Sequence, residues 1–470
     1  MRKYFDVIGL GAGSAGATVA RRLAISGRSV ALVESRRVGG ECPFVACMPS
    51  KALLRSVEVR HLNARGMELG AISVDPMLER DRQSAFARAV ERRDEVVNHR
   101  DDSAKAKELE DLGIQILRGR GQIARPGVVL VNGVEYGYDN LVVGTGSSPV
   151  RPEIEGLDGA PTWTSDEALT STHLPRSMAI LGGGPVGCEL AQIYARFGTQ
   201  VTLVEAGSKL LGPEEATISK MLAGFLVEDG IDLRLKTRVT GALVGPQGVR
   251  LNLSTDSVLN CERILLASGR TPNTNGIGLE TLGIVVGRDG LSINKTCRVP
   301  AHPNVWAAGD VTAVAPYTHT ANYQAKIIAS NILTVMERTG SRNDEQETAD
   351  YRAIPRAVYT DPAVASVGMD EVAAKKKGID TVTAVLDLDQ LARSGSDGEC
   401  GRLVLTADRS RRVLIGAAAI GPHADEWIGE AVLAVRAEIQ LSVLAQVVHL
   451  FPTYSEAYGR LFSELAGKSQ

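Results

Sequence analysis

Two closely spaced cysteines are the residues of this sequence with the clearest potential for chemistry. Cys42 and Cys47 lie in the stretch GGECPFVACMPSK, residues 39–51, in a C-x4-C arrangement directly after two glycines. On a regular helix, side chains five positions apart point about 140° away from each other and could not form a disulfide. The pair must therefore lie at a distorted helix start if it is to bridge. The dipole of a helix N-terminus also lowers the pKa of a thiol, which favours a reactive thiolate.

The composition of the chain limits the functions that this cysteine pair can have. The 470 residues carry 52 basic and 55 acidic side chains, a net charge of −3, so nothing points to a nucleic-acid partner. No apolar run reaches the roughly 18 residues that a membrane span needs. Six cysteines are too few for a disulfide scaffold in a chain of this length. We therefore expect a soluble, cytoplasmic protein whose paired cysteines are redox-active or metal-binding.

A metal site is not expected around the pair, and the other cysteines look structural. Zinc takes about four ligands, and the nearest histidine, His61, lies beyond a helical segment without a companion. The remaining cysteines are single residues in apolar or loop contexts, which predicts that they are buried as small hydrophobic side chains. These are Cys188, Cys261, Cys297 and Cys400.

The elements that must position the cysteines begin at the N-terminus. An apolar strand candidate, YFDVIGL, is followed by Gly11, Gly13 and Gly16 in G-x-G-x-x-G spacing, by a helical pattern, and by a second apolar strand ending on Glu34. This order is typical of a βαβ unit that binds a dinucleotide. Its glycines let the backbone approach a pyrophosphate at the helix N-terminus, and its acidic residue accepts a hydrogen bond from a ribose hydroxyl.

A second copy of this fingerprint lies in the middle of the chain. Gly182, Gly184 and Gly187 follow an apolar strand, and the next strand ends on Glu205 at the same spacing. Two fingerprints imply two dinucleotides, and FAD with a nicotinamide nucleotide is the simplest pair that does chemistry. Glu205 favours a free ribose 2′-hydroxyl, so NADH is expected over NADPH. Lys209 leaves NADPH open.

Together these motifs resemble the pyridine nucleotide-disulfide oxidoreductases, the flavoprotein family of dihydrolipoamide dehydrogenase, glutathione reductase and mercuric reductase. The likeness runs through nearly the whole chain. Besides the two fingerprints it includes GGECPFVACMPSK, VVGTGSSP, LASGRTPNT, VWAAGD, VYTDPAVASVG and FPTYSE. The resemblance implies bound FAD, a reducible cysteine pair and a homodimer.

Roles for single residues follow from this resemblance. Cys47 would lie against the flavin as the charge-transfer thiolate, and Cys42 would be the interchange thiol that meets substrate. Lys51 matches the lysine beside the flavin N5, and Glu189 matches the glutamate that pairs with it. Thr145 and Gly146 lie where the family closes over the FAD, and Asp310 resembles the aspartate that holds the ribityl chain. Gly269, in LASGRTPNT, is also expected to bind a cofactor.

One position breaks the family pattern. The family has a proton-transferring histidine before Pro-Thr and a glutamate five residues later, both supplied by the partner subunit. Here Glu456 is present, but Phe451 stands in the place of the histidine. Phenylalanine cannot carry a proton, and a general base typically contributes about 10²- to 10⁴-fold. We therefore expect poor dihydrolipoamide dehydrogenase or glutathione reductase activity, and the sequence assigns the missing role to neither His449 nor Tyr454.

Two members of the family that this chain resembles also lack the histidine. Mercuric reductase uses extra C-terminal cysteines, but no cysteine follows Cys400 here. The 2-ketopropyl-coenzyme M oxidoreductase/carboxylase also has phenylalanine at the position of Phe451. It has histidine where this chain has Glu456, and it lacks the Ser50–Lys51 dipeptide, so the match is partial. A pocket without a base would protect a carbanion or mixed disulfide from protons, and would equally suit electron transfer to a quinone.

We expect an α/β fold with two Rossmann-like dinucleotide-binding domains, for FAD and NAD(P), plus a C-terminal α+β dimerisation domain. The expected boundaries are 1–150 and 276–345 for the FAD domain, 151–275 for the NAD(P) domain and 346–470 for the interface domain. The expected function is electron transfer from NADH through flavin to Cys42–Cys47 and on to a small disulfide or thiol-reactive substrate. The alternatives are direct transfer from flavin to a quinone, the oxidoreductase/carboxylase reaction, and a redox-responsive subunit of a larger assembly.

Overall fold

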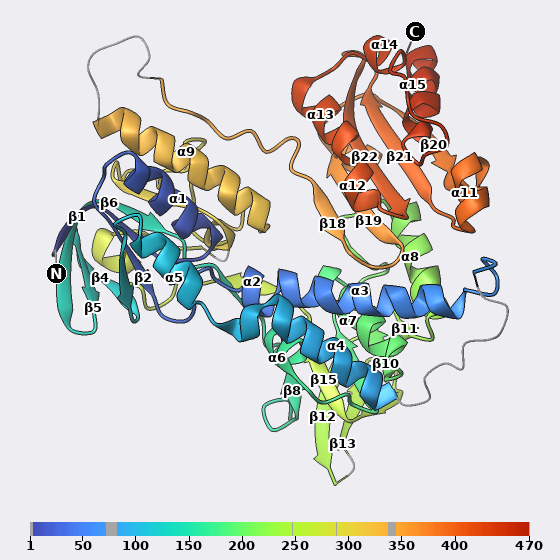
Figure 1. The fold of residues 1–470 in the computed structure, drawn as a ribbon, viewed down its shortest axis with the longest axis horizontal. Helices are drawn as coiled ribbons and strands as arrows, with labels where there is room; N and C mark the ends of the chain where they lie inside the picture. Colours follow the sequence, from blue (N-terminus) through green and yellow to red (C-terminus); the bar gives the residue numbers. More distant parts are fainter. Residues whose placement is uncertain (1–2, 72–81, 247, 288, 337–344, 470) are drawn as a thin grey trace. The chain divides into compact units, whose positions relative to one another are not determined.

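The computed structural model describes residues 3–71, 82–246, 248–287, 289–336 and 345–469 (Figure 1). The chain forms two compact units, each built from three segments. The first unit contains residues 1–49, 94–150 and 270–350, and the second contains 50–93, 151–269 and 351–470. The α/β fold with Rossmann-like sheets is confirmed. The finer division into four domain segments stays a prediction.

The first unit is built on a seven-stranded sheet whose strands are in the order β3-β2-β1-β6-β5-β4, with β17 also paired to β6. β1 pairs in parallel with both β2 and β6. The carboxyl ends of these three strands therefore meet at one edge of the sheet. The bounds are β1 (Tyr4–Leu10), β2 (Val30–Glu34), β3 (Gln115–Arg118), β4 (Gly121–Arg125), β5 (Val128–Val131), β6 (Val134–Val143) and β17 (Val305–Ala307).

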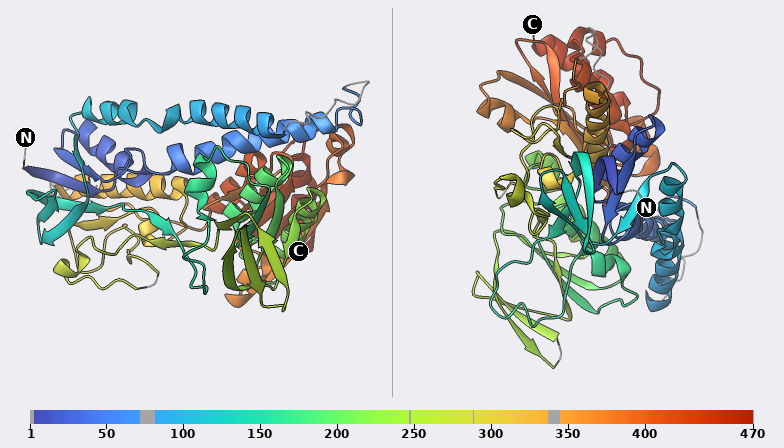
Figure 2. Two further views of the ribbon diagram at one scale, coloured as in Figure 1. Left: turned by 90° about the horizontal axis from the view of Figure 1, so that it is seen from below. Right: turned by 90° about the vertical axis from the view of Figure 1, so that its left-hand side faces the viewer.

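Three helices of the first unit lie near this edge. α1 (Ser14–Ile25) follows the first glycine turn, and it lies beside α9 (Thr318–Met336) in both views (Figures 1 and 2). Thr18 joins them by donating a hydrogen bond to the Asn322 side chain at 2.9 Å. α5 (Ser103–Glu110) precedes β3. A two-stranded ribbon of β7 (Ser147–Pro149) and β16 (Arg270–Pro272) completes the unit's strands.

The second unit repeats the parallel arrangement. Its five-stranded sheet has the order β11-β10-β9-β15-β8, with α7 (Pro185–Arg196) after the second glycine turn. A three-stranded antiparallel sheet, β12-β13-β14, adjoins it in sequence. The bounds are β8 (Thr162–Trp163), α6 (Ser165–Thr170), β9 (Ser177–Leu181), β10 (Gln200–Val204), α8 (Ala216–Glu228), β11 (Asp232–Arg234), β12 (Val239–Gly245), β13 (Gly248–Leu253), β14 (Val258–Cys261) and β15 (Arg263–Leu266).

The C-terminal part of the second unit is α+β, as expected. Its antiparallel sheet has the order β18-β19-β22-β21-β20. The apolar faces of its helices and strands form a core of their own. The bounds are β18 (Arg356–Val358), β19 (Ala363–Gly368), α10 (Glu371–Lys376), β20 (Thr381–Asp387), α11 (Ala392–Asp397), β21 (Arg402–Asp408), β22 (Val413–Gly421), α12 (Ala424–Trp427), α13 (Gly429–Ala437), α14 (Leu441–Leu444) and α15 (Glu456–Lys468).

Two long helices also contribute to the second unit. α3 (Cys47–Ala64) and α4 (Arg82–Val96) lie side by side in both views (Figures 1 and 2), and Arg92 donates to the Ala52 carbonyl at 3.0 Å. Their apolar residues, among them Leu53 and Phe86, join the core of the unit. Across the part of the chain that the structure describes, none of the helices is long and apolar enough to cross a membrane.

Candidate functional site: two dinucleotide cradles and a cysteine pair

The first glycine turn has the geometry that a dinucleotide needs. Gly11 has a φ of +99°, and a Cβ there would lie 2.3 Å from the Gly144 carbonyl oxygen. A Cβ on Gly16 would lie 2.0 Å from the Gly11 carbonyl oxygen, so neither position accepts a side chain. A Cβ on Gly13 would meet only the Gly40 Cα, at 3.7 Å. The middle glycine therefore leaves open space in front of the N-terminus of α1.

A cavity of about 790 Å³ opens at this turn in the first unit. Glu34 lies in its wall and accepts from the backbone N–H groups of Ala12 at 2.8 Å and Arg36 at 2.6 Å. The predicted residues that line the cavity are Gly11, Gly13, Glu34, Cys42, Thr145, Gly146 and Asp310. Gly16 and Gly269 are not among its lining residues.

An arginine that sequence reasoning missed organises part of this wall. Arg270 donates to Glu41 Oε2 at 2.6 Å and to Ser147 Oγ at 2.7 Å, and Ser147 donates to Asp310 at 2.6 Å. Arg36 pairs with the other Glu41 oxygen at 3.1 Å. The wall thus contains four arginines and three carboxylates, and this excess of positive charge suits a ligand that carries a diphosphate. The only available signal was the position of Arg270 directly after Gly269.

The cysteine pair lies where the helix is interrupted. α2 (Cys42–Val45) ends before Ala46, whose φ of −136° and ψ of −93° are not helical, and α3 begins at Cys47. This break is the expected distortion, and it brings Cys42 and Cys47 near each other. Both side chains are half-buried. The sulfur of Cys47 lies 3.7 Å from the hydroxyl of Thr318, the first residue of α9, which also lines the cavity.

The second glycine turn has the same close backbone contacts as the first. A Cβ on Gly182 would lie 2.3 Å from the Ala267 carbonyl oxygen, and one on Gly187 would lie 1.9 Å from the Gly182 carbonyl oxygen. A Cβ on Gly184 would have nothing within 4 Å. Glu205 accepts from Gly183 N–H at 2.6 Å and from Gly207 N–H. The second unit therefore has its own dinucleotide cradle.

The predicted pairing of Lys51 with Glu189 is present within the second unit. The Lys51 ammonium lies 3.0 and 3.2 Å from the two carboxylate oxygens of Glu189, which is buried at the start of α7. Tyr359 supports both partners. Its backbone N–H donates to Glu189 at 3.0 Å, and its ring centroid lies 4.2 Å from the ammonium. The role of this pair beside a flavin stays a prediction.

Around Phe451, the two candidate replacements for the histidine are engaged elsewhere. Phe451 is 72% exposed. His449 lies 2.9 Å from Glu430, and only 8% of its side chain is exposed. Tyr454 is buried and donates to Asp397 at 3.0 Å. Burial and this hydrogen bond raise the pKa of the Tyr454 hydroxyl, which disfavours its deprotonation.

The carboxylate of Glu456, the predicted partner of the histidine that Phe451 replaces, has one paired and one unpaired oxygen among the described residues. One carboxylate oxygen accepts from Arg460 at 2.8 Å. The other oxygen is buried and has no hydrogen-bond partner among the described residues. A buried carboxylate oxygen normally has a donor. The role of Glu456 as the partner of a proton-transferring residue stays a prediction.

The expectation for the remaining cysteines is right for three and wrong for one. Cys188, Cys261 and Cys297 are buried, and burial raises the pKa of Cys261 to about 11. Cys400 is exposed. It lies in the short connection between α11 and β21, where the chain turns at the solvent edge and Glu399 next to it pairs with Arg65.

Two glycine-turn cradles, a cysteine pair at a helix break and a C-terminal α+β part define a flavin- and nicotinamide-dependent disulfide reductase. The chain belongs to the pyridine nucleotide-disulphide oxidoreductase family, whose model matches residues 5–325, and whose dimerisation domain matches residues 354–462. The use of FAD and a pyridine nucleotide follows from this membership. The dimerisation domain supports a homodimer.

Known relatives cover nearly the full chain. A mercuric reductase of Streptomyces lividans is 33% identical over 96% of this chain and 94% of its own. A dihydrolipoyl dehydrogenase of Geobacillus stearothermophilus is 30% identical over 96% of this chain and 94% of its own. Among solved structures, the Cu(II) complex of the HOCl-induced flavoprotein disulfide reductase RclA from Escherichia coli matches with a TM-score of 0.85 and 27% identity, covering 99% of this chain and all of the other.

Proposed function

We propose that this protein uses NADH to reduce small disulfides or other sulfur electrophiles whose leaving group departs without a proton from the protein. The observation that carries the proposal is that the pair Cys42–Cys47 is present while Phe451 stands at the position where the family pattern has its base. Bound FAD would supply the two-electron chemistry that links a nicotinamide hydride to a dithiol. Expulsion of a thiolate is faster when its thiol has a low pKa, so such substrates need no general acid.

Two features support NADH as the electron donor. Glu205 directly follows β10, where a carboxylate would accept from a free ribose 2′-hydroxyl and repel a 2′-phosphate. The cation that could have compensated, Lys209, donates instead to the Glu214 backbone carbonyl. The second cradle would therefore offer a carboxylate to the ribose, while Lys209 is held by a backbone carbonyl.

Residues of this chain would bind the FAD and position the groups that react. The first cradle and the Arg270 network would bind FAD, and Lys51 with Glu189 would present a positive charge toward the flavin N5. Cys42 would exchange with substrate, and Cys47 would resolve the mixed disulfide. We place the protein in the cytoplasm, where a chain with six cysteines keeps its thiols reduced.

The first test is an anaerobic titration of the FAD-loaded protein with NADH, followed by alkylation and mass spectrometry of Cys42. Uptake of two electrons per FAD beyond the flavin's own, with newly alkylated Cys42, would support the proposal. Reduction of the flavin while both cysteines stay oxidised would contradict it. Electrons would then leave the flavin directly, and quinones would become the acceptors to test.

A further inference from the structure

The segment that joins β2 to α2, residues 35–41, forms part of the wall of the dinucleotide cavity in the first unit. All of its residues except Val38 line this cavity of about 790 Å³. That volume is within the usual range of a cofactor site, about 300 to 1,000 Å³. The contacts that hold the β2–α2 segment in place therefore bear on how a cofactor is held.

The middle of the β2–α2 segment is fixed to the first glycine turn through its backbone. The Gly39 N–H group donates to the Ala12 carbonyl oxygen at 2.8 Å. Gly40 has a φ of +77°, and a Cβ there would lie 2.8 Å from the Gly13 Cα. The segment therefore passes so close to the turn that no side chain fits between them. This is the place at which the fingerprint predicts the pyrophosphate of a dinucleotide.

The end of the β2–α2 segment is held by the side chain of its last residue, Glu41. Arg270 donates to one carboxylate oxygen at 2.6 Å, and Arg36 donates to the other at 3.1 Å. Arg270 is the first residue of β16 and comes from 229 positions further along the chain. It also donates to Ser147 Oγ of β7 at 2.7 Å. Glu41 therefore ties the segment to the ribbon of β7 and β16, which lines the same cavity.

The charges of this trio are compatible with a diphosphate. A single carboxylate in the wall would repel a diphosphate, but Glu41 lies between two guanidinium groups, and the trio has a net positive charge. The side chains of Glu41 and Arg270 are 34% and 31% exposed, so water screens their pairing only in part. Hydrogen bonds between charged groups are also stronger than those between neutral groups. Glu41 can therefore hold both arginines in place while they attract an anion.

We propose that the β2–α2 segment is a strap that encloses the diphosphate of bound FAD, and that Glu41 is the positioning residue that keeps the strap closed. The contacts of Gly39 and Gly40 with the glycine turn form its fixed end, and the pairs of Glu41 with the two arginines form the end that opens. These pairs must break before FAD leaves, so they control the rate of FAD release. The inference needs bound FAD but no particular electron acceptor, so it is independent of the proposed disulfide reduction.

The test measures FAD release after dilution of the FAD-loaded protein, followed as the loss of flavin fluorescence anisotropy. Glu41→Gln should speed release about tenfold, because glutamine keeps the size of the side chain but removes the charge that both arginines bind. The rate at which FAD binds to the FAD-free protein should change less than about twofold, because the strap closes after FAD has entered. Added salt should speed release from the wild type much more than from the variant.

The matched control is Glu135→Gln, which removes the same charge from another glutamate of the first unit. Glu135 accepts from Arg125 at 2.6 and 2.8 Å, and it is not among the residues that line the cavity. FAD release from this variant should stay at the wild-type rate. Unchanged or slower release from Glu41→Gln, or equally faster release from Glu135→Gln, would overturn the inference. Faster release together with a lower Tm of the FAD-free Glu41→Gln protein would assign the effect to the fold and would also overturn it.

Discussion

Phe451 stands where the family pattern has a proton-transferring histidine, and Glu456 stands where the pattern has its partner. Glu456 retains a buried oxygen without a donor among the described residues. We expect Phe451→His to restore the pair and to raise kcat/KM for lipoamide reduction about 10²-fold or more, since a positioned base typically contributes at least this much. The pH profile should gain a new ionisation near neutrality.

The control for this substitution is the double variant Phe451→His with Glu456→Gln. Glutamine cannot stabilise an imidazolium as a carboxylate does, so most of the gain should disappear. Equal activity of the single and the double variant would show that Glu456 does not hold the new histidine. No gain in either would show that the missing base is not what limits alkyl disulfides.

Thr318 provides a second prediction for a single residue. Its hydroxyl lies 3.7 Å from the Cys47 sulfur, at a point where the N-termini of α3 and α9 meet. A hydroxyl and two helix N-termini all favour a thiolate. In a Cys42→Ser background, Thr318→Val should shift the pH midpoint of Cys47 alkylation upward by about one unit, as expected for the loss of a hydrogen bond to a charged group.

Thr318→Ser is the matched control because it keeps the hydroxyl and removes only a methyl group. Its alkylation midpoint should stay at the wild-type value. If serine and valine shift the midpoint equally, the contact between Thr318 and Cys47 is packing rather than a hydrogen bond. Alkylation measures the thiol directly, so the result does not depend on turnover.

At the scale of the elements, we expect the glycines of one turn to have different roles, some needed for the fold and one needed for cofactor binding. Gly184 has a φ of −78°, which alanine adopts freely, and a Cβ there meets open space. Gly184→Ala should leave the Tm unchanged but raise the KM for NADH about tenfold, because its methyl group occupies the space that a pyrophosphate would fill. Gly187→Ala, whose Cβ would lie 1.9 Å from a carbonyl oxygen, should instead destabilise the protein. A lower Tm in Gly184→Ala would contradict this division of roles.

The link between α5 and the loop before Cys42 is sensitive to acid. Asp102 accepts from Val38 and from Arg118, and the hydrogen bond from Arg118 lowers the pKa of its carboxyl group. Because the pKa is lower in the folded state, Asp102 stabilises the protein above its unfolded value of about 3.9, and this contribution is lost as the pH falls below it.

The substitution Asp102→Asn tests this contribution. It should reduce the free energy of unfolding by about 2 kcal/mol at neutral pH, the size of a hydrogen bond to a charged group. The difference from wild type should shrink as the pH falls below about 3.9 and should vanish once the pH lies below the lowered folded-state pKa of Asp102, where both side chains are neutral. Urea unfolding at several pH values measures it, and a difference that stays constant with pH would contradict the assignment.

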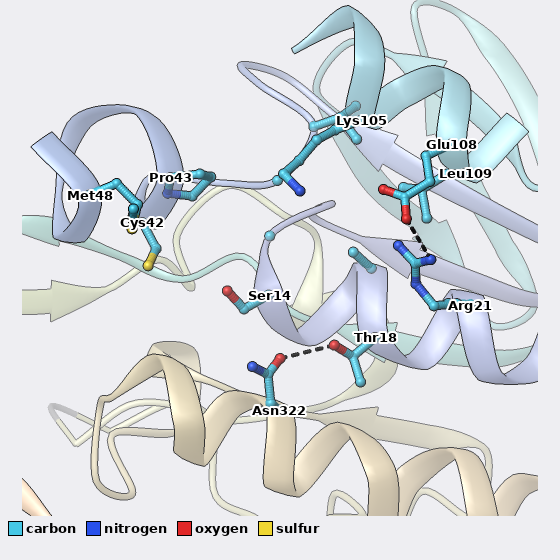
Figure 3. A pocket seen from close by; sticks show the side chains of 14 residues that line it. Ser14, Thr18, Arg21, Cys42, Pro43, Met48, Lys105, Glu108, Leu109 and Asn322 are labelled. Atoms are coloured by element: carbon cyan, nitrogen blue, oxygen red, sulfur yellow. Dashed lines mark hydrogen bonds and ion pairs between the residues drawn. The ribbon is translucent and has the colours of Figure 1, made fainter. Parts of the chain in front are cut away.

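At the scale of the whole molecule, the sequence predicted the features that depend on residues close together along the chain. Glycine spacing, the acidic residue at the strand end and the helix break between the cysteines are each fixed within about 25 residues. The contacts that sequence reasoning missed join distant segments. Glu41 meets Arg270, and Cys47 meets Thr318, 271 positions away. A cavity of about 260 Å³ beside Cys42 is lined by α1, α5 and α9, which come from separate segments (Figure 3). The exposure of Cys400 depends on where a short connection meets solvent.

The apolar surface beside Phe451 gives the last prediction, on assembly. Val448, Leu450 and Phe451 are 94%, 80% and 72% exposed, within the matched dimerisation domain. Exposed apolar groups that are adjacent in this way mark an interface. In a homodimer Val448→Asp acts twice, so we expect the dimer dissociation constant to rise about 100-fold or more, measured by analytical ultracentrifugation.

The matched control is Val285→Asp, because Val285 is also 94% exposed but lies in the first unit, outside the dimerisation domain. It should leave the dimer intact. If Phe451 of one subunit lies at the cysteine pair of the other, disulfide reduction by Val448→Asp should fall with dilution. Reduction of the flavin by NADH should not fall, because both dinucleotide cradles belong to the same chain. A monomeric variant that still reduces disulfides at full rate would show that each subunit carries a complete site.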